Sequence, residues 1–368
     1  MSMQTDRLHV VTSDDIPPAR ILAGRILIWG SAGVLAVVAV LQILQVSGRA
    51  DLGLTNWRPT LYAYLLWATC LCFGQVLIRG EQGKRALFIL PAVLFVVSLT
   101  VFPLLFGLLI AFSDWNLSSP DGRRFNGVAN LVQMWNDPFY WNALKNMVWY
   151  ALAILVEYAV AFGLALLLSS QIRARKFFRV AFLLPLMLSP VAVSWMIGKS
   201  MLEPRFGPIA RLLRTLGVET VSFFSSPVMA RLMIMLMDAW TYIPFMMIML
   251  LAGLQGIPKD VQEAAKVDGA SGWRGFWEVT FPLMLPVSVT AILIRLIFKL
   301  KLADIVITVT SGGPGGATDT VTSFIFREYR DRSNVGYGTM LAMVYLVVIV
   351  IVMTLLMKLA DRWARPQT

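Results

Sequence analysis

Long apolar segments alternate with short polar ones along most of the 368-residue chain. Each apolar segment is close to the ~20 residues that a helix needs to cross the hydrocarbon core of a bilayer. The pattern predicts an all-α membrane protein with about eight transmembrane helices. The expected spans are residues 22–46, 60–78, 86–112, 144–168, 177–198, 228–252, 284–309 and 339–357.

The composition agrees with a protein that crosses the membrane many times. Hydrophobic residues make up 58% of the chain and charged residues only 14%, and the mean hydropathy is +0.71. The net charge of +11 does not predict a nucleic-acid partner, because basic residues are typical of cytoplasmic loops and no basic run with interleaved aromatics occurs. Cys70 and Cys72 lie within an apolar run and His9 is the sole histidine. We therefore expect no metal site and no catalytic residue.

The basic residues predict the orientation of the chain. Short basic connections follow the second and fourth expected spans, and further cations end the chain; these are Arg79, Lys84, Arg85, Arg173, Arg175, Lys176, Arg179, Lys358, Arg362 and Arg365. Cations are enriched in cytoplasmic loops. An even number of spans places both termini on that side, so residues 1–20 are expected to be a cytoplasmic tail.

A polar segment, residues 255–282, separates the sixth and seventh spans on the same predicted side. Pro258 suits the first turn of a helix over 260–267. Asp268 and Gly269 then end the helix, because glycine tolerates the left-handed conformation at a helix end. Ser271 is a suitable cap for a second short helix over 272–279. The segment is predicted to form a compact helix–turn–helix, which we call the knob.

The residues of the knob resemble a known motif. Glu263-Ala264-Ala265, Asp268-Gly269-Ala270, Phe276 and Phe281-Pro282 are similar to the EAA loop of permease subunits of binding-protein-dependent ABC importers, in the carbohydrate branch typified by the maltose and glycerol-phosphate permeases. The resemblance extends over roughly 86–358. It implies a type I importer permease fold over 86–360, preceded by two accessory spans within 21–80, in a bacterial inner membrane.

The resemblance also implies partners. These are a second homologous permease, two ATPase subunits that bind ATP and Mg, an extracytoplasmic substrate-binding protein, membrane lipid and a carbohydrate-type small molecule. This chain should carry no cofactor, since Gly198-Lys199-Ser200 lacks the glycine that a P-loop requires at Val193. The residues expected to dock on the ATPase are Glu263, Ala264, Ala265, Asp268 and Gly269. Asp268 and Gly269 have an alternative role, which is only to end the helix.

Charges inside the seventh span suggest a substrate path. Arg295 and Lys299 are four residues apart and share one helix face. By the resemblance, they are ligand contacts together with the aromatic residues around Pro244, which are Trp240, Tyr242 and Phe245. Two cations motivate the hypothesis of an anionic carbohydrate derivative, bearing a sulfonate, phosphate or carboxylate. The alternative, with equal weight, is pairing with Asp238, Glu157 or Asp304, or with the partner subunit.

Two other classes of function compete with this interpretation. A secondary, ion-coupled sugar transporter would show inverted repeats and would not need a cytoplasmic docking loop. An intramembrane enzyme would require a nucleophile–base pair or a metal cluster, and the sequence suggests neither.

Overall fold

The computed structural model describes residues 16–46, 53–54, 56–120, 122–170, 172–218 and 222–364. Most of the expected N-terminal tail, residues 1–15, lies outside the described part. The chain forms two compact units, Met1–Phe106 and Gly107–Thr368. The sequence predicts a boundary between the accessory spans and the permease domain at residues 80–86, and this boundary stays a prediction.

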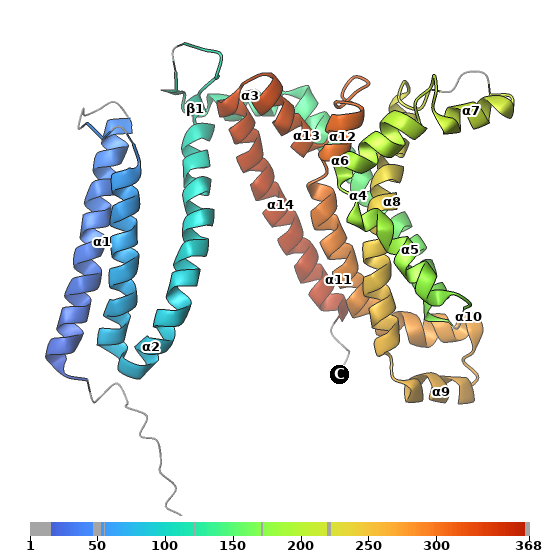
Figure 1. Ribbon diagram of the computed structural model, residues 1–368, viewed down its shortest axis with the longest axis horizontal. Helices are drawn as coiled ribbons and strands as arrows, with labels where there is room; N and C mark the ends of the chain where they lie inside the picture. Colours follow the sequence, from blue (N-terminus) through green and yellow to red (C-terminus); the bar gives the residue numbers. More distant parts are fainter. Residues whose placement is uncertain are drawn as a thin grey trace, which may run out of the picture. The chain divides into compact units, whose positions relative to one another are not determined.

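The first unit consists of α1 (Pro18–Val46) and most of α2 (Arg58–Ala111). A straight helix of the 54 residues of α2 would be about 80 Å long, more than twice the thickness of a hydrocarbon core. Gly80 breaks it with φ 54° and ψ −122°, so α2 turns back and supplies the expected second and third spans (Figure 1). Gly24 and Gly74 let α1 approach α2 closely, since a Cβ on Gly24 would lie 2.9 Å from the Gly74 carbonyl oxygen.

The second unit is almost entirely helical. Its helices, with π-helical segments marked η, are α3 (Ala129–Asn136), α4 (Pro138–Ser169), α5 (Arg175–Met187), α6 (Pro190–Val193), η2 (Ser194–Met201), α7 (Pro208–Thr215), α8 (Pro227–Gly256), α9 (Lys259–Val267), α10 (Gly272–Gly275), η3 (Phe276–Thr280), α11 (Phe281–Leu300), α12 (Asp304–Val309), α13 (Val321–Phe326), η4 (Arg327–Asp331) and α14 (Val335–Ala364). Two short antiparallel strands, β1 (Ser113–Asp114) and β2 (Arg124–Phe125), pair with Ser113 opposite Phe125.

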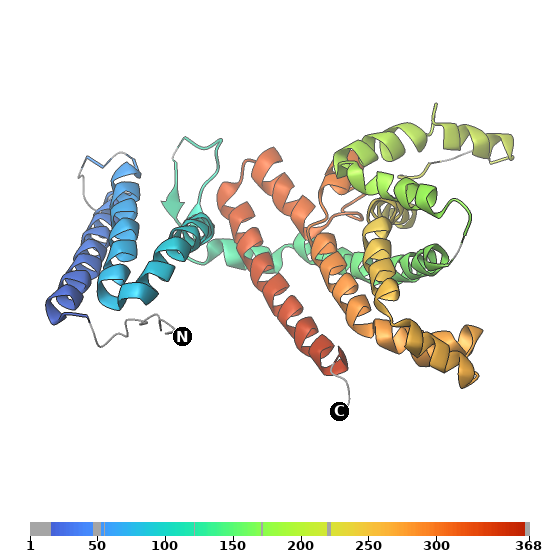
Figure 2. The same cartoon turned by 60° about the horizontal axis from the view of Figure 1, so that its bottom comes forward.

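Helix α8 is at the centre of this unit. It packs against α4, α5 and α11, and α11 in turn packs against α14 (Figures 1 and 2). Fully buried alanines, including Ala143, Ala161 and Ala165, line one face of α4. Small residues allow helix backbones to approach closely where lipid gives no hydrophobic driving force between helices. The resulting core is largely apolar, but it also buries charged side chains, which include Asp319, Glu328 and the group described below.

The prediction of one continuous span over 177–198 was wrong. The structure has α5, then a bend of 96° into the segment Pro190–Met201. Ser189 at the bend is extended, with φ −68° and ψ 147°, and the proline that follows it disfavours the helical conformation at this position. Its hydroxyl accepts a hydrogen bond from the backbone N–H of Ala192 (3.2 Å) and caps the new helix.

The seventh expected span is also interrupted. The sequence predicts one helix over 284–309, whereas α11 ends at Leu300 and α12 begins at Asp304. At the break, the backbone carbonyls of Leu300 and Leu302 accept hydrogen bonds from hydroxyls at the start of α13. Thr322 donates to Leu300 (3.2 Å) and Thr320 to Leu302 (2.5 Å). Carbonyls at the helix end are thus satisfied outside the helix.

The two ends of the second unit carry different structures. The knob, the α4–α5 connection and the end of α14 lie at one end, whereas α3, α7, α12 and α13 lie at the other (Figure 1). This grouping agrees with the sides that the sequence predicts for these segments. By the positive-inside rule, the sequence predicts that the knob end is cytoplasmic, and this orientation stays a prediction.

Candidate functional site

The knob has the helix–turn–helix form that its sequence predicts. Helix α9 ends where the N–H of Asp268 donates to Ala264 (3.0 Å) and that of Ala270 to Ala265 (2.8 Å). Gly269 adopts φ 79°, the left-handed conformation that favours glycine. Ser271 occupies the cap position of α10, but its side chain makes no capping hydrogen bond. The second helix continues through η3 into α11 without a break.

The predicted docking residues are accessible on this knob. Glu263, Ala264, Asp268 and Gly269 are exposed and Ala265 is half-buried. Within the described residues Glu263 makes no ion pair. Arg274, a cation of the same knob, pairs with Glu278 (Nε–Oε1 2.8 Å). The carboxylate of Glu263 is therefore available to another molecule. Its role in docking stays a prediction.

Aromatic side chains join the knob to the helices behind it. The ring of Phe276 lies edge-on to that of Phe162 on α4, with centroids 5.5 Å apart, and 5.9 Å from the ring of Phe281. Trp273 and Trp277 pack on Phe276 from the knob side. These ring contacts link α10 and η3 of the knob to α4 and α11.

One group of charges is buried where α4, α8 and α11 meet. Arg295 donates from Nε to Glu157 Oε2 (2.7 Å), and Lys299 donates to Glu157 Oε1 (2.6 Å). Both cations also pair with Asp238. Arg295 and Lys299 are fully buried, as their four-residue spacing on one face of α11 allows. We call these four residues the buried quartet.

The formal charges of the buried quartet sum to zero. This matters because an unpaired charge in an apolar interior is strongly unfavourable, whereas a paired and hydrogen-bonded one can be held. Of the partners that the sequence offered to the cations, the structure uses Glu157 and Asp238 but not Asp304. In the described part of the chain, Nη1 of Arg295 is the one buried nitrogen of the quartet without a hydrogen-bond partner.

Aromatic rings cover the quartet on one side. The guanidinium of Arg295 lies 4.6 Å from the ring centroid of Tyr242, a cation–π distance. Phe298 packs against both Tyr242 (5.7 Å) and Phe245 (5.4 Å). The structure therefore brings four predicted residues together: Tyr242, Phe245, Arg295 and Lys299. Phe298 was missed, although it follows Arg295 by three residues and so shares its helix face.

Trp240 lies apart from this group. It is 38% exposed and makes no ring contact with the other predicted residues in the described structure. Two residues along an α-helix differ by about 200° in direction, so Trp240 and Tyr242 leave α8 on opposite sides.

A cavity of about 190 Å³ lies against the quartet. It is lined by Pro190, Asp238, Tyr242, Phe298, Lys301, Leu302, Ala303, Asp304 and Ile305. Lys301 and Asp304 are exposed there, and Lys301 makes no ion pair with any described residue. Aromatic faces beside a few polar groups are typical of sites that bind small polar ligands. The bend at Ser189 places Pro190 in this cavity wall.

Comparison with known proteins identifies similar chains. Residues 159–366 match the family described as "Binding-protein-dependent transport system inner membrane component". The chain is 34% identical over 267 residues to the sulfoquinovosyl glycerol transport system permease protein SmoG of Agrobacterium fabrum, covering 72% of this chain and 86% of that one. It is 31% identical over 287 residues to the lactose transport system permease protein LacF of Rhizobium radiobacter, covering 75% and 93%.

A solved structure has the same fold. A chain of a bacterial ABC transporter involved in the import of the acidic polysaccharide alginate superimposes with a TM-score of 0.68 at 22% identity. The match covers 77% of this chain and 99% of that one. The predicted type I importer permease fold is thereby confirmed.

Proposed function

Since this chain belongs to the binding-protein-dependent transport system inner membrane components, we propose that it forms half of the translocation pathway of an ATP-driven carbohydrate importer. A second homologous permease supplies the other half, and two ATPase subunits bind ATP and Mg beneath them. An extracytoplasmic binding protein delivers the sugar. Relatives named as permeases for sulfoquinovosyl glycerol, trehalose/maltose and lactose support this proposal.

The knob carries the mechanical part of the proposal. Its exposed helix α9 presents Ala264, which has almost no side chain, and Glu263, which has no ion pair within the described structure. A small residue lets another protein approach the helix backbone, and the carboxylate offers a partner for an arginine or lysine of the ATPase. Closure of the ATPases would push α9, and the contact of Phe276 with Phe162 would pass the push to α4.

Site-directed crosslinking tests this coupling. The variant Ala264→Cys, in the complex purified from membranes, is expected to crosslink through its introduced cysteine to a nucleotide-binding subunit. Leu216→Cys, directly after α7, is the matched control, because Leu216 is 71% exposed and α7 lies at the opposite end of the unit (Figure 1). Failure to crosslink at 264 while uptake still depends on ATP would refute the docking role. Uptake that persists without ATP but stops without the proton gradient would instead favour a secondary transporter.

Within the carbohydrates, we propose that the cargo is an anionic derivative. Arg295 and Lys299 are already neutralised by Glu157 and Asp238, so they offer no net charge to a ligand. Lys301 in the neighbouring cavity has no such partner and would face the anionic group, while Tyr242 and Phe298 would stack on the sugar ring. The sulfonated cargo in the name of one relative supports this choice.

Uptake measurements with a charged and a neutral sugar test the cargo. The variant Lys301→Gln is expected to weaken uptake of a sulfonated or carboxylated glycoside roughly tenfold, because a hydrogen bond between charged groups contributes about 1.5 kcal/mol or more. Uptake of the neutral parent glycoside should not change. Equal uptake of the two sugars by the unsubstituted transporter would show that the cargo site does not select an anion.

A further inference from the structure

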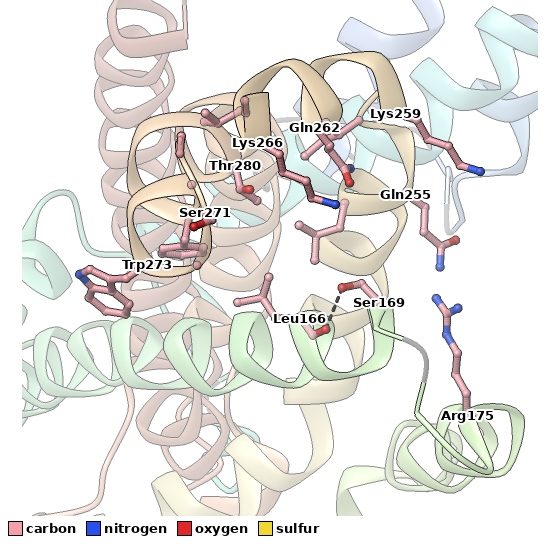
Figure 3. A pocket seen from close by; sticks show the side chains of 18 of the residues that line it. Leu166, Ser169, Arg175, Gln255, Lys259, Gln262, Lys266, Ser271, Trp273 and Thr280 are labelled. Carbon is pink, nitrogen blue, oxygen red and sulfur yellow. Dashed lines mark hydrogen bonds between the residues drawn. The ribbon is translucent and has the colours of Figure 1, made fainter. Parts of the chain in front are cut away.

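A second and larger cavity lies at the knob end of the chain, away from the buried quartet. Its volume is about 1030 Å³, and its walls come from the end of α4, the start of α5, the end of α8 and the knob. Figure 3 shows Lys266 and Gln262 directed from α9 toward the end of α4, while Arg175 points from α5 toward Gln255. We call this space the basal cavity.

The charges around the basal cavity all have one sign. Four cations line it, which are Arg175, Arg179, Lys259 and Lys266. None of its described lining residues is acidic, and none of the four cations makes an ion pair within the described chain. This contrasts with the buried quartet, where each cation has two carboxylate partners. The excess of positive charge points to an anion that comes from outside this chain.

The two arginines have unused hydrogen-bonding capacity. With its amide oxygen facing them, Gln255 accepts from Nη2 of Arg179 (2.5 Å) and Nη2 of Arg175 (3.1 Å). The Nε atoms of both arginines are buried and have no partner. Arginine presents several donors in a fixed planar geometry that matches the oxygens of a phosphate. Neutral groups from Gln262, Ser271 and Thr280 add further hydrogen-bonding atoms to the walls.

Apolar side chains beside the cavity indicate how such an anion is attached. Leu166, Leu254 and Ile257 line the cavity together with its cations, at the end of the helices that is predicted to face the cytoplasm. A charged headgroup in the cavity would thus lie next to apolar side chains suited to acyl chains. Basic pockets between membrane helices on the cytoplasmic side are known to hold lipid headgroups.

We propose that the basal cavity binds the phosphate headgroup of an anionic glycerophospholipid from the cytoplasmic leaflet. The headgroup would be shared between Arg175 and Arg179 on α5 and Lys266 on α9, and would so hold the knob against the membrane helices. This proposal does not depend on the cargo of the transporter. It requires only that the knob lies on the cytoplasmic side.

Native mass spectrometry of the purified transporter complex tests the proposal. Phosphatidylglycerol is titrated into the delipidated complex, and the occupancy is compared with that of phosphatidylcholine. The double variant Arg175→Gln/Arg179→Gln is expected to bind phosphatidylglycerol roughly 30-fold more weakly, which corresponds to about 1 kcal/mol for each cation. The matched control is Arg173→Gln/Lys176→Gln, which removes the same charge from exposed positions that do not line the cavity. The control should bind as the unsubstituted complex does.

Further measurements separate the lipid from other anions. Inorganic phosphate and glycerol 3-phosphate should not displace phosphatidylglycerol at millimolar concentration, because they lack acyl chains. Binding of these soluble anions without retention of phosphatidylglycerol would overturn the lipid assignment. If the double variant and its control weakened phosphatidylglycerol binding equally, the effect would be unspecific electrostatic attraction. That result would also overturn the proposal.

A variant on the opposite wall guards against a folding defect in α5. Lys266→Gln on α9 is expected to weaken phosphatidylglycerol binding roughly fivefold, the effect of one cation. The variant Gln262→Cys tests whether the ATPase subunit fills the cavity in place of a lipid. If it crosslinks quantitatively to the ATPase subunit while phosphatidylglycerol retention is unaffected by Lys266→Gln, the cavity is a protein interface and the proposal is refuted.

Discussion

The buried quartet and the knob place the same kinds of side chain in opposite environments. In the quartet, Glu157 and Asp238 are matched by two cations inside the helix bundle. On the knob, Glu263 is exposed and makes no ion pair within the described structure. Desolvation accounts for the difference, because a charge removed from water must be paired, whereas an exposed one is stabilised by solvent until a partner arrives. The ion pairs of the buried quartet stabilise the fold of this chain, whereas the exposed carboxylate of Glu263 can form an ion pair with another protein.

Removal of one quartet carboxylate should produce the largest effect. We expect Glu157→Gln to lower the free energy of unfolding by about 3–5 kcal/mol, because Arg295 and Lys299 would then share one remaining carboxylate in an apolar interior. Thermal unfolding in detergent, compared with exposed Glu278→Gln as a control, measures it. A loss no larger than that of the control would mean that water reaches the quartet.

Removal of charges in matched pairs should cost less than removal of one. The double variant Glu157→Gln/Lys299→Met leaves one cation and one carboxylate, Arg295 and Asp238, which already contact each other. We expect it to be more stable than Glu157→Gln alone by about 1–3 kcal/mol, the coupling typical of residues in one network. A double-mutant cycle of thermal stabilities measures the coupling. Strict additivity would contradict the description of the four residues as one unit.

Enlargement of the docking face should affect transport and not folding. We expect Ala264→Trp to reduce ATP-dependent uptake roughly tenfold or more, since overpacking an interface costs about 1–3 kcal/mol. Its thermal stability should be unchanged because residue 264 is exposed. Leu216→Trp, directly after α7, is the control for a large exposed residue elsewhere. Normal uptake by Ala264→Trp would exclude this face of α9 from the coupling.

Strain at the turn of the knob should have the smallest effect. Gly269→Val forces a branched side chain into φ 79° and is expected to destabilise the knob by about 1–2 kcal/mol. Gly256→Ala is the control, because Gly256 has no positive φ and a Cβ there would meet no atom within 4 Å. Hydrogen exchange of α9 measures the change. Loss of uptake without faster exchange would mean that Gly269 contacts the ATPase and does more than end the helix.

The sequence predicted much of the knob because its signals are local. Pro258, Asp268 and Gly269 restrict the backbone at their own positions, and the structure has α9 and its left-handed turn within one residue of the expected bounds. The shared face of Arg295 and Lys299 was predictable for the same reason, since helical periodicity depends only on spacing.

The interruptions of the fifth and seventh spans were not predicted from hydropathy. An average over an apolar segment does not register one extended residue such as Ser189, although the proline that follows it was a visible signal. At the end of α11, backbone carbonyls accept hydrogen bonds from the hydroxyls of Thr320 and Thr322, which lie 18 and 22 residues further along the chain, so no local pattern predicts this end.

What the sequence determined by itself was the class of protein: apolar segments of bilayer length and a local motif of prolines, glycine and small residues on the knob. Only the tertiary structure decided which charges are partners. Glu157 and Arg295 are 138 residues apart, and the sequence left their pairing and the recruitment of an outside anion equally open. Packing of α4, α8 and α11 settled this, because burying four charges together is tolerable only when each carboxylate meets a cation.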